Sequence, residues 1–328
     1  MPCYHPIEAW DLTSDFSNPY VKREISFKVP DLRLREKLIR QGRQLQLPCR
    51  KCVGCRLSKS REWANRLVLE QLYHQESWFL TLTYDDEHLP PAYPVNPDTG
   101  EILSVHATLV KCDLQKFMKR LRFNSGQQIR FFAAGEYGSQ TYRPHYHLLL
   151  FGLHLDDLVL LKQNFASQPY FTSDFISKCW PFGIHILGSI SFQSAAYVAR
   201  YTLKKATHGF DRRFYEAAGI EPEFQLMSNR PGIARQFYDD HPEIFRFDSF
   251  SVSTPTGGLK MRPPEYFRKL FKDSHSVEYF ERSQKARLSA ENVMHLKLML
   301  TDNDYCDILR IEEEKCFNRI SCLVRDSI

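Results

Sequence analysis

Apolar and β-branched runs alternate with amphipathic stretches along the middle of this 328-residue chain. Four runs have the composition of strands: SWFLTLTY (77–84), QIRFFAAGEYG (128–138), HYHLLLFG (145–152) and GIHILGSI (183–190). Apolar residues recur at helical spacing in four other stretches: 57–75, 113–123, 156–165 and 192–205. This order of strands and helices predicts an α+β domain in which helices cover one face of a mostly antiparallel sheet.

The pattern is weaker before and after this region. PDLRLREKLIRQG (30–42) predicts a short helix, STPTGGLKMRPP (253–264) resembles a linker, and two or three charged helices end the chain. We therefore expect three segments: an N-terminal segment with a basic helix (1–75), a core (76–210) and a C-terminal extension (211–328).

Composition narrows the class of protein. Hydrophobic residues make up 43% and charged residues 25% of the chain, and no apolar run reaches 18 residues. The first residues, MPCYHPIEAWDL, lack the pattern of a secretion signal, so neither export nor membrane insertion is expected. Nine cysteines, an odd number, fit reduced thiols better than a disulfide scaffold.

The net charge of +5 is unevenly distributed. Residues 50–66 carry six Lys or Arg against one acidic residue, and residues 111–130 carry six against one. Basic segments interleaved with aromatic residues favour contact with nucleic-acid phosphates, whereas the alternative is that they are solvated helix faces.

Two histidines occupy alternate positions of one predicted strand. Side chains two residues apart on a strand point to the same face about 7 Å apart, so His145 and His147 can share one divalent cation. Glu136 can face the same site from the preceding strand, and Asp85 and Asp86 are alternative carboxylates. Two histidines and a carboxylate suit Mg²⁺ or Mn²⁺ with a phosphate oxygen, and zinc also fits. Alternatively, both histidines only make structural hydrogen bonds.

A tyrosine pair follows in the predicted helix AAYVARYTLKK. Tyr197 and Tyr201 are four residues apart and share a helix face, and Arg200 and Lys204 each lie three residues after a tyrosine. A neighbouring cation makes a phenol, whose ordinary pKa is about 10, a better nucleophile. Attack on a DNA phosphodiester would give a 5′-phosphotyrosine and a free 3′-hydroxyl. The alternative is aromatic packing on an amphipathic helix.

Three cysteines, Cys49, Cys52 and Cys55, form a C-x2-C-x2-C cluster before the first long helix. Cys3 or His5 can complete a tetrahedral zinc site if the N-terminus folds back. The alternatives are reduced cysteines at a helix start, or an iron–sulfur centre.

Together, PCRKCVGCR, FLTLTYDDEHLP, GEYGSQTYRPHYHLLLFG and YVARYTLKK resemble the HUH endonucleases that initiate rolling-circle replication. The chain is most similar to the replication initiators of gokushoviruses, small single-stranded DNA bacteriophages of the Microviridae, and MSNRPGIARQF (227–237) supports this. The resemblance extends to about residue 265. It implies an HUH endonuclease fold in 76–210, with flanking helices on a central antiparallel sheet and a helical C-terminal extension.

The resemblance also assigns roles. It implies that His145 and His147 bind the metal and that Tyr197 and Tyr201 are the nucleophiles. Two residues depart from the family pattern: Tyr146 stands between the histidines where an aliphatic residue is usual, and Arg200 stands where lysine is frequent.

The implied activity is a metal-dependent, site-specific DNA endonuclease that nicks the viral origin, starts rolling-circle replication and rejoins the displaced strand. Its partners would be single-stranded DNA and double-stranded origin DNA, in the cytoplasm of the bacterial host. The chain has no P-loop motif, so a host helicase and DNA polymerase are implied. Two other functions fit some of the motifs: a single-strand DNA transposase of the HUH class, which usually has one tyrosine, and a non-enzymatic, zinc-dependent nucleic-acid-binding protein.

Overall fold

The computed structural model describes residues 3–15, 18, 21–28, 30–93, 99–102, 106–138, 141–163, 167–204, 212–254 and 257–321; the side chains of residues 193, 200–204, 212 and 213 are outside the description. The chain divides into two compact units, one of residues 1–59 with 263–328 and one of residues 60–262. The three-segment organisation expected from the sequence stays a prediction.

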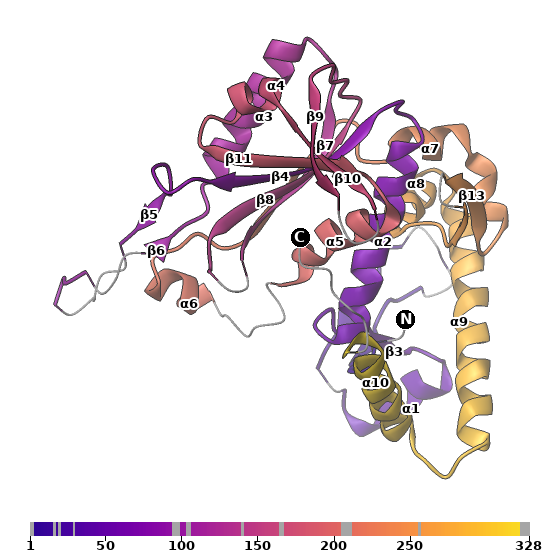
Figure 1. Cartoon of the computed structure of the whole chain (residues 1–328). Coiled ribbons are helices and arrows are strands. Elements are labelled where there is room, and N and C mark those ends of the chain that lie inside the picture. Colours follow the sequence, from indigo (N-terminus) through magenta and orange to yellow (C-terminus); the bar gives the residue numbers. More distant parts are fainter. Residues whose placement is uncertain are drawn as a thin grey trace. The chain divides into compact units, whose positions relative to one another are not determined.

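A seven-stranded antiparallel sheet forms the centre of residues 60–262 (Figure 1). Its strand order is β12-β7-β8-β4-β11-β10-β9. The strands are β4 (Ser77–Tyr84), β7 (Arg130–Tyr137), β8 (Pro144–Phe151), β9 (Leu158–Gln163), β10 (Pro169–Ser173), β11 (Gly183–Ser189) and β12 (Phe224–Met227). The predicted α+β class and antiparallel sheet are confirmed, and β4, β7, β8 and β11 correspond to the four predicted strands.

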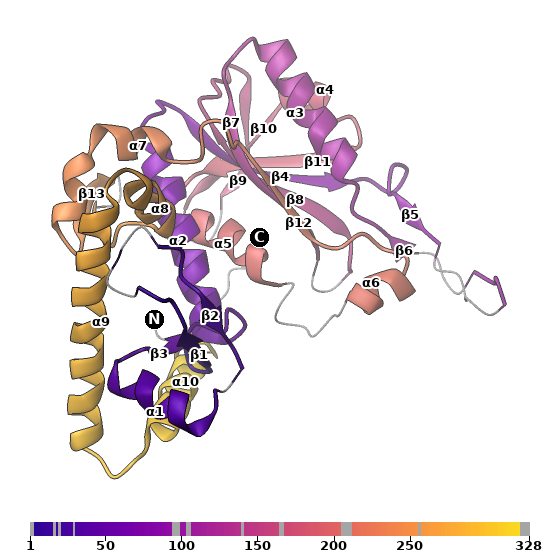
Figure 2. The same cartoon turned by 180° about the vertical axis from the view of Figure 1, so that it is seen from behind.

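Helices cover both faces of this sheet, not one as the sequence pattern suggested (Figures 1 and 2). On one face α3 (Lys111–Ser125) and α4 (Asp174–Cys179) pack against the central strands, with Phe117 of α3 and Leu148 of β8 in one buried cluster. On the other face lie α2 (Val53–Gln71) and α5 (Phe192–Lys204). The Trp63 ring of α2 packs 4.9 Å from the Phe132 ring of β7. Both layers are possible because alternate strand residues point to opposite faces and both sets here are largely apolar.

The helix predicted at 156–165 is wrong. Residues Leu158–Gln163 form β9, an edge strand that pairs antiparallel with β10. Val159, Leu160 and Leu161 of this strand are exposed, so no continuous apolar face is buried as the helix would require. Pairing with β10 thus overrides the helix preference of a leucine-rich segment.

Two smaller details also differ from prediction. The helix predicted at 113–123 begins at Lys111, and Asp113 in its first turn accepts a hydrogen bond from the Tyr84 hydroxyl at 2.9 Å. The expected linker at 253–264 contains part of a hairpin, in which β13 (Phe250–Thr254) pairs with β14 (Gly257–Met261).

Buried polar contacts attach α2 to the segment that follows β12. The Arg66 guanidinium donates to the Ile233 carbonyl at 3.1 Å. Glu70 accepts hydrogen bonds from the Arg130 guanidinium and from the backbone N–H of Ala234. Burial alone would raise the pKa of the Glu70 carboxyl, but hydrogen bonds from His74, Arg130 and Ala234 lower it below its usual value. These contacts hold α2 in a defined position on the sheet.

The other unit contains a three-stranded sheet of order β2-β1-β3 and four further helices. Its elements are β1 (Ile7–Asp11), β2 (Ile25–Ser26), β3 (Gln44–Leu47), α1 (Leu32–Arg40), α8 (Glu265–Ser274), α9 (Ser276–Met299) and α10 (Tyr305–Ser321). The predicted short helix is confirmed as α1, and the predicted charged C-terminal helices as α8 to α10. The remaining elements, all in residues 60–262, are β5 (Pro91–Ala92), β6 (His106–Ala107), α6 (Arg212–Ala217), α7 (Arg235–Asp240) and the 3₁₀ helix Pro242–Arg246.

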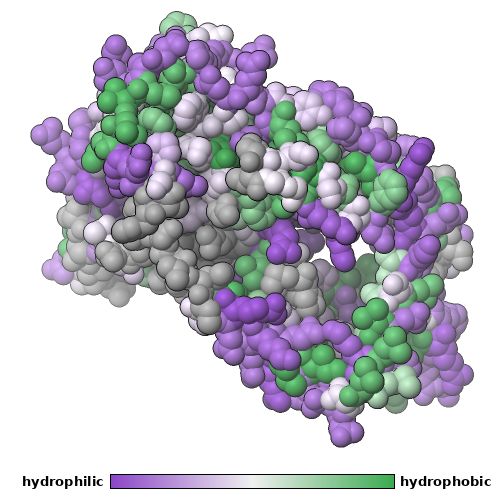
Figure 3. Space-filling view, turned by 45° about the vertical axis from the view of Figure 1, so that its right-hand side comes forward, coloured by the Kyte–Doolittle hydropathy of each residue, from purple (hydrophilic) through white to green (hydrophobic). Residues whose placement is uncertain are grey.

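Hydrophilic residues predominate on the face shown in Figure 3, with smaller hydrophobic areas between them. None of the helices in the described part of the chain combines the length and the apolar composition needed to cross a membrane.

Candidate active site on the central strands

The register of three neighbouring strands collects polar side chains on one sheet face. β8 lies between β4 and β7. His147 is paired with Thr81 of β4, and His145 is paired with Thr83 of β4 and with Glu136 of β7. Because residues paired across a sheet point to the same face, these five side chains share the face that α5 covers.

Two threonines orient the two histidines. The Thr81 hydroxyl lies 3.1 Å from His147 Nδ1, and the Thr83 hydroxyl lies 2.9 Å from His145 Nδ1. Each hydroxyl engages the Nδ1 side of its ring and so fixes the direction in which Nε2 points. Thr81 and Thr83 were not among the candidate site residues predicted from the sequence. The signal was present, since T-L-T and H-Y-H have the same alternating spacing on strands that pair.

Glu136 is the carboxylate that contacts His147. Its Oε1 lies 2.6 Å from His147 Nε2, and both side chains are buried, with about 4% of each residue exposed. Asp85 is instead within hydrogen-bond distance of His88, which lowers the pKa of the Asp85 carboxyl, and Asp86 forms an ion pair with Arg143 at 2.7 Å. The contacts of this structure therefore favour Glu136 over both alternatives.

Glu136, His145 and His147 offer the kinds of donor atom that a hard divalent cation accepts, but their ligand atoms are not all as close together as those of a compact metal site among the described residues. Glu136 offers an oxygen and His147 a nitrogen in contact, with the His145 ring centre 6.4 Å from that of His147. Neighbouring ligands that each bind Mg²⁺ at about 2.1 Å lie about 3 Å apart, whereas Glu136 and His147 are in direct hydrogen-bond contact, so a bound cation would have to replace that hydrogen bond. Gly138 leaves space beside the other histidine, because a Cβ there would lie 3.1 Å from His145 Nε2. Mg²⁺ or Mn²⁺ at this position remains a prediction.

Tyr197 is brought to the same place by α5. Its ring centre lies 5.4 Å from the His147 ring in an edge-on arrangement and 6.3 Å from the Phe79 ring. Phe79 in turn stacks on His147 with 13° between the ring planes. The tyrosine thus packs against aromatic rings and also adjoins the candidate metal ligands, so the packing interpretation and the catalytic one are compatible.

The other three candidates on α5 are placed only by their backbone. Arg200, Tyr201 and Lys204 belong to the helix Phe192–Lys204, but their side chains lie outside the described residues. The roles suggested for them from the sequence stay predictions.

Tyr146, the residue between the histidines, points to the opposite sheet face as expected. Its hydroxyl lies 2.8 Å from the Tyr84 hydroxyl and accepts a hydrogen bond from the Val110 N–H, also at 2.8 Å. Burial raises the pKa of Tyr146 to about 12. This side chain therefore belongs to the core and is no candidate nucleophile.

The basic segment 111–130 does not lie beside the site. It forms α3, on the face of the sheet opposite His147. The Arg120 guanidinium donates to the Cys179 carbonyl at 2.8 Å, and the Arg122 guanidinium donates to the Ile129 carbonyl at 2.8 Å. These two arginines therefore make structural hydrogen bonds, and contact between nucleic-acid phosphates and the rest of the segment stays a prediction.

The basic segment 50–66 is better placed. Within α2, the Ser60 hydroxyl donates to the Ala196 carbonyl of α5 at 3.3 Å, one residue from Tyr197. The next residue, Arg61, is exposed. A cationic side chain is therefore available on the same side of the sheet as the candidate site.

Comparison with known proteins gives a consistent result. The family model for replication-associated protein ORF2/G2P matches residues 77–206, the region that contains β4, β8 and α5. The chain is 34% identical over 284 residues to the replication-associated protein ORF2 of Spiroplasma virus 4, with 85% of each chain covered. It is 29% identical over 308 residues to the replication-associated protein VP4 of Bdellovibrio phage phiMH2K, with 90% of this chain and 85% of the relative covered. No solved structure matches.

Removal of either threonine hydroxyl is expected to weaken the site without unfolding the sheet. In Thr81→Val and Thr83→Val the histidine rings lose the contact that fixes their orientation, so the affinity for Mn²⁺ should fall about 10- to 100-fold. Calorimetric titration with Mn²⁺ measures this. Thr172→Val is the matched control, because it removes a threonine–histidine contact (to His185, 3.1 Å) elsewhere in the same sheet. Equal Mn²⁺ affinity in the unaltered chain and the three variants would contradict the proposed role of Thr81 and Thr83 in orienting the histidines.

Proposed function

The chain belongs to the family of gokushovirus-type replication initiators, and we propose that it starts replication by nicking the viral origin through a covalent tyrosine intermediate. The observation that carries this proposal is the convergence of Glu136, His147 and Tyr197 on one sheet face. A group that can bind a cation and a phenol that can attack phosphorus are the two requirements of this chemistry.

In the proposed reaction, Tyr197 or Tyr201 attacks a phosphodiester of single-stranded origin DNA. The phenol loses its proton, its oxygen forms a bond to phosphorus, and the bond from phosphorus to the 3′ oxygen breaks. The leaving oxygen takes up a proton and becomes a free 3′-hydroxyl, while the 5′ side stays attached as a phosphotyrosine. A cation held by Glu136, His145 and His147 would supply positive charge to the phosphate when bound.

Burial of the histidine and the carboxylate supports this role. Both residues have about 4% of their surface exposed, so an electrostatic interaction with the phosphate would be little screened by water. Phe79 and Tyr197 border His147 and restrict its ring to one orientation. The site is thereby arranged before DNA binds, which lowers the cost of reaching the reactive geometry.

The phosphotyrosine preserves the energy of the bond that was broken. A 3′-hydroxyl can attack it later, which restores a phosphodiester and releases the tyrosine without ATP. The free 3′-hydroxyl in the meantime serves as the primer for a polymerase. We propose that the host supplies this polymerase and the helicase that separates the strands, because the sequence contains no P-loop motif.

Two tyrosines one helical turn apart suit a repeated cycle. One would stay bound to the first 5′ end while the other cuts the regenerated origin. The 3′-hydroxyl then released would close the displaced strand into a circle. A transposase of the same class would need only one tyrosine, and a purely DNA-binding zinc protein would leave the contacts between Glu136, His147 and Tyr197 without a function.

Substitution of the tyrosines tests this cycle. We expect Tyr197→Phe and Tyr201→Phe each to retain some cleavage, with the DNA adduct on the remaining tyrosine, but to fail in repeated release of closed circles. The double variant should bind DNA and form no adduct. The assay uses labelled single-stranded fragments that tile the genome encoding this chain, with denaturing gels and mass spectrometry of the adduct peptide. An adduct on only one tyrosine, with the other dispensable for circles, would reduce the enzyme to a single nucleophile.

DNA contacts should come from the α2 side of the sheet rather than from α3. Arg61→Ala is expected to weaken binding of single-stranded DNA and to reduce the slope of log affinity against log salt by about 0.7, the value for one lost phosphate contact. Lys119→Ala is the matched control, because Lys119 is exposed on α3 on the opposite face. Filter binding at several salt concentrations measures both. If Lys119→Ala weakened DNA binding more than Arg61→Ala, the DNA would lie on the α3 face of the sheet, which would contradict the proposed binding side.

A further inference from the structure

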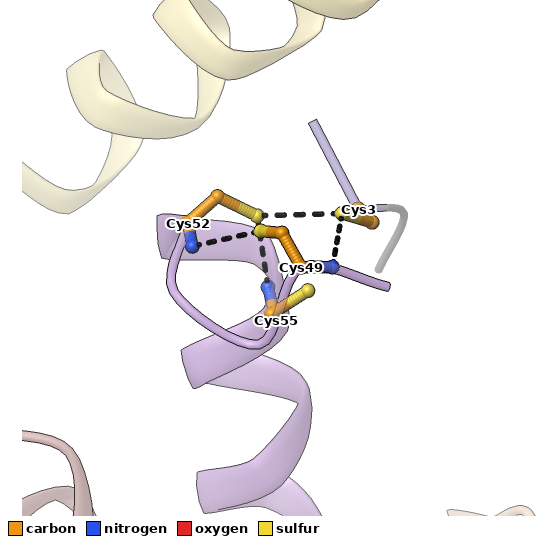
Figure 4. Close-up of side chains that lie close together, drawn as sticks. All are labelled: Cys3, Cys49, Cys52 and Cys55. Carbon is orange, nitrogen blue, oxygen red and sulfur yellow. Dashed lines mark hydrogen bonds between the residues drawn. The ribbon is translucent and has the colours of Figure 1, made fainter. Parts of the chain in front are cut away.

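Four cysteines from two distant parts of the sequence lie together in the unit formed by residues 1–59 and 263–328. Cys49 and Cys52 lie just before α2, Cys55 is in its first turn, and Cys3 is brought in by the N-terminal segment (Figure 4). Their four sulfur atoms all lie within 4.8 Å of one another. Metal ions in proteins are held mainly by cysteine, histidine and acidic side chains. Among such side chains in the described part of the chain, these four cysteines form the group compact enough to enclose a metal ion.

The spacing of the sulfurs is that of a metal site rather than of a disulfide. Cys3 Sγ and Cys52 Sγ are 3.9 Å apart, whereas a disulfide bond is about 2.0 Å long. Zinc binds thiolate sulfur at about 2.3 Å, which sets the sulfur–sulfur edge of a regular tetrahedron at about 3.8 Å. The thiols are therefore already near the separation that one tetrahedral ion requires.

Backbone N–H groups point at these sulfurs. Cys49 N–H donates to Cys3 Sγ at 3.2 Å, Cys52 N–H donates to Cys49 Sγ at 3.3 Å, and Cys55 N–H donates to Cys52 Sγ at 3.5 Å. Tyr4 N–H also donates to Cys52 Sγ, at 3.4 Å. Hydrogen bonds of this kind favour the thiolate, which is the form that binds a metal. Such donors around the ligands are typical of metal sites.

The alternative fourth ligand has another partner. His5 Nε2 lies 2.7 Å from the Glu313 carboxylate of α10, so this ring is engaged on the protein surface. The sequence left either Cys3 or His5 as the fourth ligand, and the contacts of this structure favour Cys3.

We propose that Cys3, Cys49, Cys52 and Cys55 bind one structural Zn²⁺ ion. Four thiolates leave no open position, which is characteristic of structural rather than catalytic zinc. As each remaining thiol binds, it releases its proton to solvent. The donors are soft sulfurs, whereas the candidate nuclease site offers nitrogen and oxygen, so the two sites would select different metals.

The zinc would close the end of the small sheet at which β1 pairs with β3, because Cys3 precedes β1 and Cys49 follows β3. It links the N-terminal segment to the start of α2 across 46 residues of sequence. The small apolar cluster around it includes Tyr4, Val53, and Cys316 of α10. A cluster of this size stabilises little by itself, and a metal that closes a long loop offsets part of the chain entropy lost on folding.

Metal analysis of the intact chain tests the proposal. Protein purified from zinc-supplemented cells under reducing conditions, then dialysed against EDTA to remove weakly held ions, should contain about one zinc per chain. X-ray absorption at the zinc edge should show four sulfur neighbours at about 2.3 Å. The variant with both His145→Ala and His147→Ala should keep its zinc, which separates this site from the nuclease site. Absence of stoichiometric zinc, or nitrogen and oxygen neighbours in the spectrum, would overturn the proposal, and so would iron with inorganic sulfide.

Variants add a second test. Cys49→Ser should lose most of its zinc and unfold at a lower temperature. Two controls, Cys112→Ser at an exposed position of α3 and His5→Ala, should keep the zinc content and the unfolding temperature of the unaltered chain. Retention of a full zinc by Cys49→Ser would contradict the ligand set. If that variant fails to fold, the absorption spectrum of the unaltered chain still decides the question.

Discussion

The contact between Glu136 and His147 depends on one constraint, the register of β7, β8 and β4. In this register His145 is opposite both Glu136 and Thr83, and His147 is opposite Thr81. A shift of one residue in either pairing would turn the partner strand's side chains to the other face. The apolar residues that alternate with these polar ones form the core under α3, so burial of that core also enforces the register of the site.

The two faces of β8 carry different kinds of side chain, which explains why a strand of the core can carry two histidines. Leu148 and Leu150 point toward α3, and Tyr146 on the same face bonds to Tyr84. The histidines occupy the alternate positions, and His147 packs against Tyr197 of α5. The two faces share one backbone but carry different side chains, so one face can be polar around the histidines while the other stays apolar.

Much of this arrangement could be predicted from local sequence. The strands around residues 77–84 and 145–152 and the helix at 192–205 have clear periodicity, and their motifs together indicated the family that the comparisons confirm. The edge strand β9 could not be recognised, because its leucine-rich sequence favours a helix and only the partner strand decides otherwise.

Contacts between distant residues were harder still to predict. The roles of Arg120 and Arg122 depend on carbonyl groups presented by other segments, and a count of charges cannot reveal them. Cys3 is similar: its place beside Cys49 follows from the path of the N-terminal segment, which has no periodic signal of its own.

In the proposed reaction, Glu136 completes the metal site that serves the tyrosines. The most direct measurement compares covalent DNA adduct formation by the unaltered chain, Glu136→Gln and Asp85→Asn, each with Mn²⁺ and with EDTA. We expect the unaltered chain and Asp85→Asn to form the adduct with Mn²⁺ and to lose it in EDTA, whereas Glu136→Gln should form little adduct under either condition. Adduct formation by Glu136→Gln at the level of the unaltered chain, or undiminished adduct in EDTA, would contradict the proposed reaction.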